Sequence, residues 1–167
     1  MTAYPLVIRP AGPGDAAVIA DVWLRSFHTA LPTVRRAHCD DEVRRWISEV
    51  LLPWHEAWVA EADGVVVGML ALSPGWVDQF YLDPDWRGRG NGDRLVALAR
   101  QRQPSGLQLW TFQVNEAACR FYQRHGFVAV EWTHGAENEE REPAVRYVWP
   151  DVSAGRSRPM PDSGTWT

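Results

Sequence analysis

The chain has 167 residues, of which 46% are hydrophobic and 23% are charged, and this length and composition are typical of one globular domain. Its 17 basic and 21 acidic residues leave a formal net charge of −4, which argues against a nucleic acid as the main partner. No apolar run approaches the ~18 residues of a membrane-spanning helix, so we expect a cytoplasmic protein with no membrane partner.

The cysteines and histidines carry no sign of a metal site. Cys39 and Cys119 lie far apart in the sequence, and neither stands in a CxxC pair. The five histidines show no spacing typical of zinc ligands. We therefore expect two reduced thiols, no disulfide and no bound metal.

The first half of the chain is predicted to contain a strand, two helices and a β-hairpin. Pro13 and Asp15 are typical of a first helical turn, and apolar side chains recur at helical spacing after Asp15 and again after Asp40. Asp63-Gly64 lies between two apolar runs and is the strongest short signal of a hairpin. The second of these runs is apolar at nearly every position, which predicts a central strand covered on both faces. The predicted elements are a strand at residues 6–9, helices at 12–31 and 40–53, and strands at 57–61 and 65–72.

The second half alternates strands with helices. A strand from Trp76 to Leu82 leads through a glycine-rich loop into a helix that ends near Gln101. A strand at 107–112, a short helix at 115–126 and strands at 127–132 and 144–149 follow. This order predicts an α/β (α+β) fold for a domain of residues 1–150, with a mixed sheet and helices on both of its faces. Residues 151–167 are rich in Ser, Pro, Gly and Arg, and we expect them to form a disordered tail.

The segment Arg87–Gly92 reads RGRGNG and is the most informative loop. A loop that connects a strand to a helix presents free backbone N–H groups at the first helical turn, which is a ready site for an anion. The segment contains no GxxxxGK[ST] sequence, and the third glycine of a dinucleotide-binding GxGxxG would fall on Asp93. What remains is RxxGxG, formed by Arg87, Gly90 and Gly92, which by itself is also compatible with a surface turn.

A second motif follows downstream. Asn115, Ala118, Phe121, Tyr122, Gly126 and Phe127 form the pattern NxxAxxFYxxxGF. With the RxxGxG loop and the order of elements from Leu6 to Trp149, this motif resembles the GCN5-related N-acetyltransferase (GNAT) family. The resemblance implies a mostly antiparallel mixed sheet that is splayed between its fourth and fifth strands.

The resemblance also implies acetyl-CoA as the acetyl donor. In the family, the loop binds the pyrophosphate, and the strand before it pairs with the pantetheine arm. Asn115 would bond the pantetheine, and its other role as a helix N-cap is compatible with this. Arg124 is a candidate for a phosphate contact or, alternatively, a solvated charge. The candidate cofactor-binding residues are Phe80, Tyr81, Leu82, Arg87, Gly88, Arg89, Gly90, Asn91, Gly92, Asp93, Asn115, Ala118, Phe121 and Arg124.

Two positions in the loop depart from the family pattern. Asn91 replaces the usual apolar residue between the last two glycines, which removes a packing anchor. Asp93 brings a negative charge into the first helical turn beside the expected pyrophosphate. Its charge would repel phosphate unless it points to solvent or pairs with Arg94 or Arg89.

The resemblance assigns Tyr122 as the acid that protonates the departing thiolate, although Tyr122 also fits a core position of its helix. Strand alternation places Asp78 on the same face as Phe80, so Asp78 is a candidate base, with a solvated strand-end carboxylate as the alternative. Glu61, His134 and a relay of water are other possible bases.

The acceptor is expected to be a primary amine of a small molecule or a peptide, held without nucleic acid or membrane. Phe27, His28 and Trp46 are candidate substrate-binding residues from the first two helices, and each could equally belong to the core. Glu137 is a further candidate substrate-binding residue, from the acidic loop at residues 134–142. The carboxylates of this loop could favour a cationic amine or simply face water. A homodimer is possible. The alternative function is a non-catalytic CoA-binding module of the same fold, which would not need Tyr122.

Overall fold

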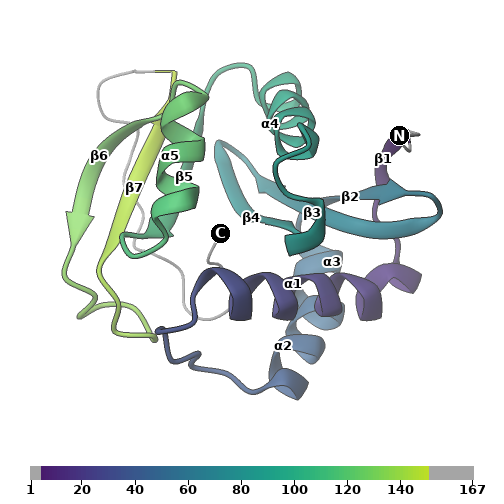
Figure 1. Ribbon diagram of the computed structural model, residues 1–167, viewed down its shortest axis with the longest axis horizontal. Helices are drawn as coiled ribbons and strands as arrows, with labels where there is room; N and C mark the ends of the chain where they lie inside the picture. The colour runs from purple at the N-terminus through teal and green to yellow at the C-terminus, as the bar shows by residue number, and fades with distance from the viewer. Residues whose placement is uncertain (1–4, 151–167) are drawn as a thin grey trace.

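The computed structural model describes residues 5–150, so the predicted tail at 151–167 lies outside the described residues. Figure 1 shows the arrangement of the elements. The strands are β1 (Leu6–Pro10), β2 (Glu56–Ala62), β3 (Val65–Ser73), β4 (Trp76–Leu82), β5 (Leu107–Phe112), β6 (Val128–Thr133) and β7 (Ala144–Trp149). The α-helices are α1 (Ala16–Ala30), α2 (Asp40–Trp46), α3 (Leu52–Trp54), α4 (Asn91–Arg102) and α5 (Glu116–Arg124).

The strands form one seven-stranded sheet in the order β1-β2-β3-β4-β5-β7-β6. All neighbouring pairs are antiparallel except β4 and β5, which are parallel. Strands β4 and β5 pair at a single position, Trp76 with Gln108, and Figure 1 shows the two strands separating beyond it. The expected mixed and mostly antiparallel sheet, splayed between its fourth and fifth strands, is confirmed.

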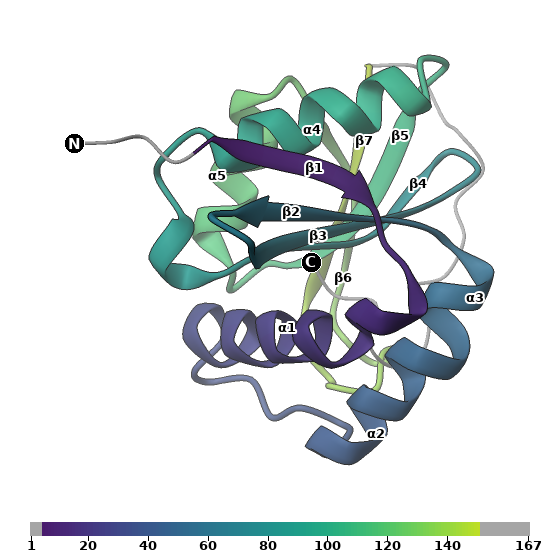
Figure 2. The same ribbon diagram turned by 90° about the vertical axis from the view of Figure 1, so that its right-hand side faces the viewer.

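Helices cover both faces of the sheet (Figure 2). Each face has its own hydrophobic core. Helices α1 and α2 pack on one face, where Trp23, Phe27 and Ile47 are almost completely buried. Helices α4 and α5 pack on the other, around Leu95 and Tyr122. Side chains of β3 contribute to both cores, which confirms that β3 is a central strand covered on both sides.

Local chemistry accounts for the hairpin, and a proline marks the main departure from the predicted helices. Asp63 and Gly64 both adopt positive φ, at 50° and 74°, as the turn of a two-residue hairpin requires. The predicted helix at 40–53 is instead α2, a π-helical turn at Ile47–Leu51 and then the short α3. Pro53 lies at this irregular end, where it has no N–H to donate and crowds the preceding turn.

Candidate active site

The loop between β4 and α4 is shaped by glycines. Gly88 and Gly90 have φ of 72° and 77°, a conformation that side chains with a Cβ disfavour. Gly90 is the N-cap of α4, so the N–H groups of the first turn of α4 have no partner within the helix. The Asn91 side chain donates to the Trp86 carbonyl oxygen at 3.0 Å, so a polar anchor holds this loop in place of the expected apolar one.

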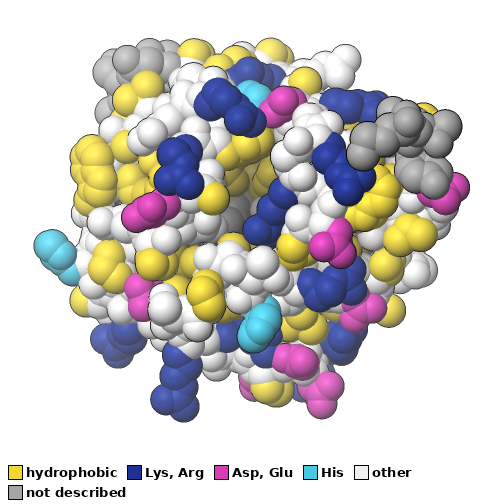
Figure 3. Space-filling view, viewed as in Figure 1, with side chains coloured by type: hydrophobic (Ala, Val, Ile, Leu, Met, Phe, Trp, Pro, Cys, Tyr) yellow, Lys and Arg dark blue, Asp and Glu magenta, His cyan; other side chains and the backbone are white. Residues whose placement is uncertain are grey.

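A cleft of about 700 Å³ opens beside this loop, between the two diverging halves of the sheet. Figure 3 shows the hollow in the surface, with basic side chains gathered around it. Twelve of the fourteen predicted cofactor-binding residues line the cleft, and the two that do not are Arg89 and Asn91. The lining residues are Ser26, Phe27, Ala30, Leu31, Phe80, Tyr81, Leu82, Arg87, Gly88, Gly90, Gly92, Asp93, Asn115, Ala117, Ala118, Arg120, Phe121, Tyr122 and Arg124.

The separation of β4 from β5 supplies one wall of the cleft. One edge of β4 is paired with β3 along its length, and the other edge leaves β5 after Trp76. Phe80, Tyr81 and Leu82 line the cleft from this second edge. A peptide-like chain could therefore hydrogen-bond to β4 as an added strand does.

Aromatic packing fixes the opposite wall. The ring centroids of Phe80 and Phe121 are 5.6 Å apart, and a Cβ on Gly92 would lie 2.9 Å from the Phe121 ring. Only glycine at position 92 allows α4 and α5 to approach this closely. Asn115 caps α5 by accepting a hydrogen bond from the Ala118 N–H at 3.2 Å, so the capping role of Asn115 is present at the cleft.

Tyr122 is both a core residue and a cleft residue. Its side chain is 2% exposed and packs edge-on against Phe121 and Phe127. The residue also lines the cleft, at the junction of β4 and α5. The two interpretations of Tyr122 from the sequence are thus compatible, because the ring fills the core while the residue faces the cavity.

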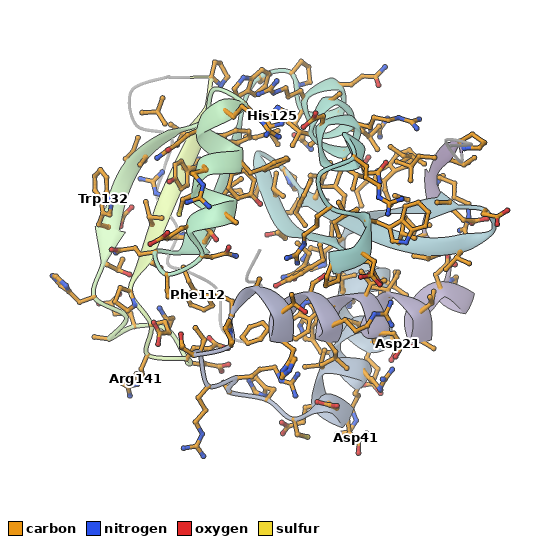
Figure 4. All side chains as sticks on the ribbon, viewed as in Figure 1. Asp21, Asp41, Phe112, His125, Trp132 and Arg141 are labelled. Carbon is orange, nitrogen blue, oxygen red and sulfur yellow. The ribbon has the colours of Figure 1, made fainter. Side chains whose placement is uncertain are left out.

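Asp93 has partners that were not expected. Its carboxylate accepts from Arg124 at 3.1 Å and lies 2.8 Å from His125 Nε2, at the end of α5 that faces α4 (Figure 4). Arg89 instead lies over the Trp86 ring at 5.0 Å, and Arg94 donates to the Leu6 carbonyl oxygen. The charge of Asp93 is thus partly neutralised by Arg124, which was a candidate either for a phosphate contact or for a solvated charge.

Arg87 and Arg120 are further cations at the cleft. Desolvation by the cleft walls lowers the pKa of Arg87, and Asp83 partly opposes this shift. A guanidinium remains charged at neutral pH after such a shift. Arg120 lines the cleft but was not a candidate from the sequence, and its guanidinium also lies 3.6 Å from the Glu116 carboxylate.

Asp78 lies away from the cleft. A β-bulge shifts the register of β4, because Val77 pairs with Leu72 and Gln79 with Ala71, so Asp78 is an extra residue. The bulge interrupts strand alternation here, so the face of Asp78 does not follow from that of Phe80. Asp78 is only 5% exposed, and its carboxylate lies 3.9 Å from His55 Nε2. It lines neither this cleft nor the second cavity.

The predicted acceptor-side residues divide into two groups. Phe27 lines the cleft, and Trp46 lines a second cavity of about 40 Å³ on the α1–α2 side. His28 and Glu137 are exposed and line neither cavity. His28 points away from the sheet because α1 buries its Trp23 and Phe27 face instead.

The second cavity contains residues that the sequence did not single out. Its lining residues are Trp23, Arg36, His38, Glu42, Val43, Trp46 and Glu140. His38 Nε2 lies 2.6 Å from the Glu139 carboxylate, so the α1–α2 loop is joined to the β6–β7 loop. Only the density of carboxylates at residues 137–142 hinted at this site in the sequence.

Between residues 5 and 150, none of the helices has the length and apolar character needed to cross a membrane. The same stretch contains no cluster of three or more His, Cys, Asp or Glu side chains that could hold a metal ion.

Comparison with known proteins identifies relatives of this chain. The family model described as Acetyltransferase (GNAT) domain matches residues 53–129. The chain is 28% identical over 147 residues to the peptidyl-lysine N-acetyltransferase YiaC of Escherichia coli (strain K12), covering 87% of this chain and 98% of that protein. It is 34% identical over 125 residues to the peptidyl-lysine N-acetyltransferase YjaB of the same organism, covering 72% and 80%.

Solved structures share the fold. The apo-form solution structure of YjaB from Escherichia coli has a TM-score of 0.74 and 25% identity, covering 87% of this chain and 97% of that one. The PaiA N-acetyltransferase from Thermoplasma acidophilum, in complex with coenzyme A, has a TM-score of 0.66 and 18% identity, covering 85% and 98%.

Proposed function

Because this chain belongs to the GNAT family of acetyl-CoA-dependent N-acetyltransferases, we propose that its acceptor is the side-chain amine of a lysine in a protein or peptide. The acceptor class is supported by YiaC and YjaB, which are both peptidyl-lysine N-acetyltransferases and are aligned over most of their length. The observation that carries the proposal is that the anion-binding loop, the open edge of β4 and Tyr122 line one cleft.

The residues of the cleft fit acetyl-CoA. The first-turn N–H groups of α4 and the Arg87 guanidinium suit its pyrophosphate, and the open edge of β4 suits the amides of its pantetheine arm. Gly92 and Phe121 form the cradle that a Cβ at position 92 would fill. When bound, acetyl-CoA supplies an acetyl group activated as a thioester.

Tyr122 is the proposed proton donor to the departing sulfur. Its position between β4 and α5 is where a chain that follows β4 from the loop would bring its reactive end. A phenol with a pKa near 10 can protonate a thiolate without being charged itself at neutral pH. The amine must lose a proton before it attacks, which costs about 4.6 kcal/mol for a lysine at pH 7. Asp78 does not line the cleft, which does not favour it as the direct acceptor of that proton.

Two measurements test the proposal. Acetyl-CoA and CoA, but not NADH, should raise the midpoint of thermal unfolding, with about 2.7 kcal/mol of stabilisation at a hundredfold excess over Kd. Incubation with acetyl-CoA and a lysine-containing peptide library should then yield peptides acetylated at lysine, detected by mass spectrometry. Absence of a thermal shift with either CoA species would contradict the cofactor site. Binding without transfer to any lysine would contradict the acceptor.

A further inference from the structure

The β6–β7 loop is folded so that one carboxylate points into the protein. The Asn138 side chain donates to the Glu142 carbonyl oxygen at 2.7 Å and accepts from the Glu142 N–H at 3.1 Å. Gly135 has a φ of 84°, and a Cβ there would lie 2.5 Å from the Glu142 carbonyl carbon. These constraints close the loop tightly. Glu140 is consequently 8% exposed and lines the second cavity, whereas Glu137 faces solvent.

Tyr81 belongs to the cofactor cleft and packs against a wall residue of the second cavity. Its ring lines the cleft and lies 5.4 Å from the ring of Trp23, which lines the second cavity. The side chain is 5% exposed, and its hydroxyl has no hydrogen-bond partner within the described part of the chain. Burial, and then the proximity of Tyr122 and Glu140, raise the pKa of Tyr81 well above its ordinary value. Tyr81 is thus a buried phenol in the cleft that Tyr122 also lines, and its ring packs on Trp23, which lines the same cavity as Glu140.

The charges around the second cavity favour a cation. Glu42, Glu140 and the neighbouring Glu139 supply three carboxylates, against Arg36 and His38 as basic groups. Arg36 also contacts Asp40 and the His38 carbonyl oxygen.

The remaining lining residues, Trp23, Val43 and Trp46, are apolar or aromatic. Indole rings beside carboxylates suit an ammonium group carried on an alkyl chain.

We propose that Glu140 receives the proton of the incoming lysine ammonium and that the Tyr81 hydroxyl positions the resulting amine toward the thioester beside Tyr122. This inference rests on the lysine acceptor proposed above. The ammonium loses one proton to the Glu140 carboxylate, and the neutral nitrogen bonds to the acetyl carbon. The carbon–sulfur bond breaks with its electron pair on sulfur, which takes the Tyr122 proton. The second proton of the nitrogen returns to Tyr122, and Glu140 releases its proton to solvent.

The test compares two acceptors that differ in the proton they must lose. Lysine is almost fully protonated at pH 7, whereas an acyl hydrazide on a peptide of the same sequence is neutral. Glu140→Gln should lower kcat/KM for the lysine peptide about 100-fold at pH 7. The loss should shrink about tenfold for each unit of rising pH, because more lysine is then neutral. The hydrazide peptide should lose less than about threefold.

Two further variants complete the experiment. Tyr81→Phe keeps the ring, and it should raise KM for the peptide and lower kcat, about tenfold in kcat/KM, for both acceptors. Glu49→Gln, an exposed carboxylate on the π-helical turn, is the matched surface control and should behave as the wild type. Each variant should keep the thermal shift with acetyl-CoA, which shows that it is folded and that its cofactor site is intact.

The outcomes separate this inference from the proposed function. Wild-type protein that acetylates the lysine peptide, with Glu140→Gln equally active, would overturn the role of Glu140 and leave the function standing. An equal loss for both acceptors with no recovery at high pH would reduce Glu140 to a structural residue and also overturn it. Wild-type protein that binds acetyl-CoA but acetylates no lysine peptide would contradict the proposed function itself.

Discussion

The proposed cofactor side and the proposed acceptor side of the site are built from contacts of very different sequence range. On the cofactor side, the loop at residues 87–92 and the first turn of α4 are consecutive, and the Asn115 cap acts over three residues. On the acceptor side, the pair His38–Glu139 spans 101 residues and joins two loops without regular structure. Short motifs therefore form the proposed acetyl-CoA site, whereas the second cavity depends on how the α1–α2 and β6–β7 loops meet.

The largest expected effect lies where the two sides join. Tyr122→Phe should lower kcat at least about 100-fold, because the departing sulfur loses its proton donor while the ring remains packed. Thermal stabilisation by acetyl-CoA should not change. Tyr147→Phe is the control, since the Tyr147 ring lies 6.0 Å from Tyr122 but Tyr147 does not line the cleft. Equal turnover of Tyr122→Phe and wild type in single-turnover assays would remove Tyr122 from the acid role.

A smaller but more selective effect is expected on the cofactor side. Gly92→Ala places a Cβ 2.9 Å from the Phe121 ring, so α4 and α5 must separate or Phe121 must turn. We expect a loss of about 1–3 kcal/mol in the free energy of unfolding and weaker acetyl-CoA binding. Gly14→Ala is the control, because a Cβ at position 14 meets nothing within 4 Å. Urea unfolding and calorimetric titration measure the two quantities. Unchanged CoA affinity in Gly92→Ala would show that this close approach is not part of the cofactor site.

Asp93 offers a change in the opposite direction. Asp93→Asn should release Arg124 from its ion pair and remove a negative charge beside the pyrophosphate, so CoA should bind a few-fold more tightly, by about 1 kcal/mol or less. The same change removes an acid from the first turn of α4, which should cost about 0.3–1 kcal/mol of stability. Titration calorimetry at low and at moderate salt measures the first effect. Weaker CoA binding in the variant would show that the Asp93–Arg124 pair organises the site rather than competes for it.

The smallest expected effect concerns the long-range contact of the acceptor side. Burial, the largest single influence, lowers the pKa of His38, but Glu139 and Glu42 together outweigh it and leave the pKa raised above 6.5. A raised folded-state pKa means that the charged contact stabilises fully below pH 6.5 and is lost as the pH rises through the raised value. The difference in unfolding free energy between wild type and His38→Gln should therefore shrink with rising pH, from about 1 kcal/mol at most. A difference that grows with pH would contradict this contact.

The sequence predicted the cofactor side far better than the acceptor side, for a physical reason. Gly88, Gly90 and Gly92 are needed for local backbone geometry, and Asn115 and Tyr122 stand at fixed spacings within one helix. Such requirements are visible in the sequence itself. The order of strands and the hairpin at Asp63-Gly64 were likewise predictable, since each depends on a local pattern.

The acceptor side depended on features that no local pattern reveals. The extra residue in β4 removes the basis for placing Asp78 on the face of Phe80, because strand alternation cannot predict a bulge. The loop at residues 134–142 showed many carboxylates, but the choice of Glu140 rather than Glu137 as the inward one is made by the Asn138–Glu142 hydrogen bonds. The contact of His38 with Glu139 joins the α1–α2 loop to the β6–β7 loop, and it can be seen only in the three-dimensional structure.

The cations around the cleft have one further chemical property. Arg87, Arg120 and Arg124 are all guanidinium groups, and none of the 167 residues printed for this chain is a lysine. At pH 7 about one lysine side chain in 2,500 is neutral and nucleophilic, whereas for arginine the fraction is roughly one in a million. The groups proposed to hold the acetyl donor are thus inert toward it. None of these 167 residues can serve as the proposed lysine acceptor, which must therefore lie outside them.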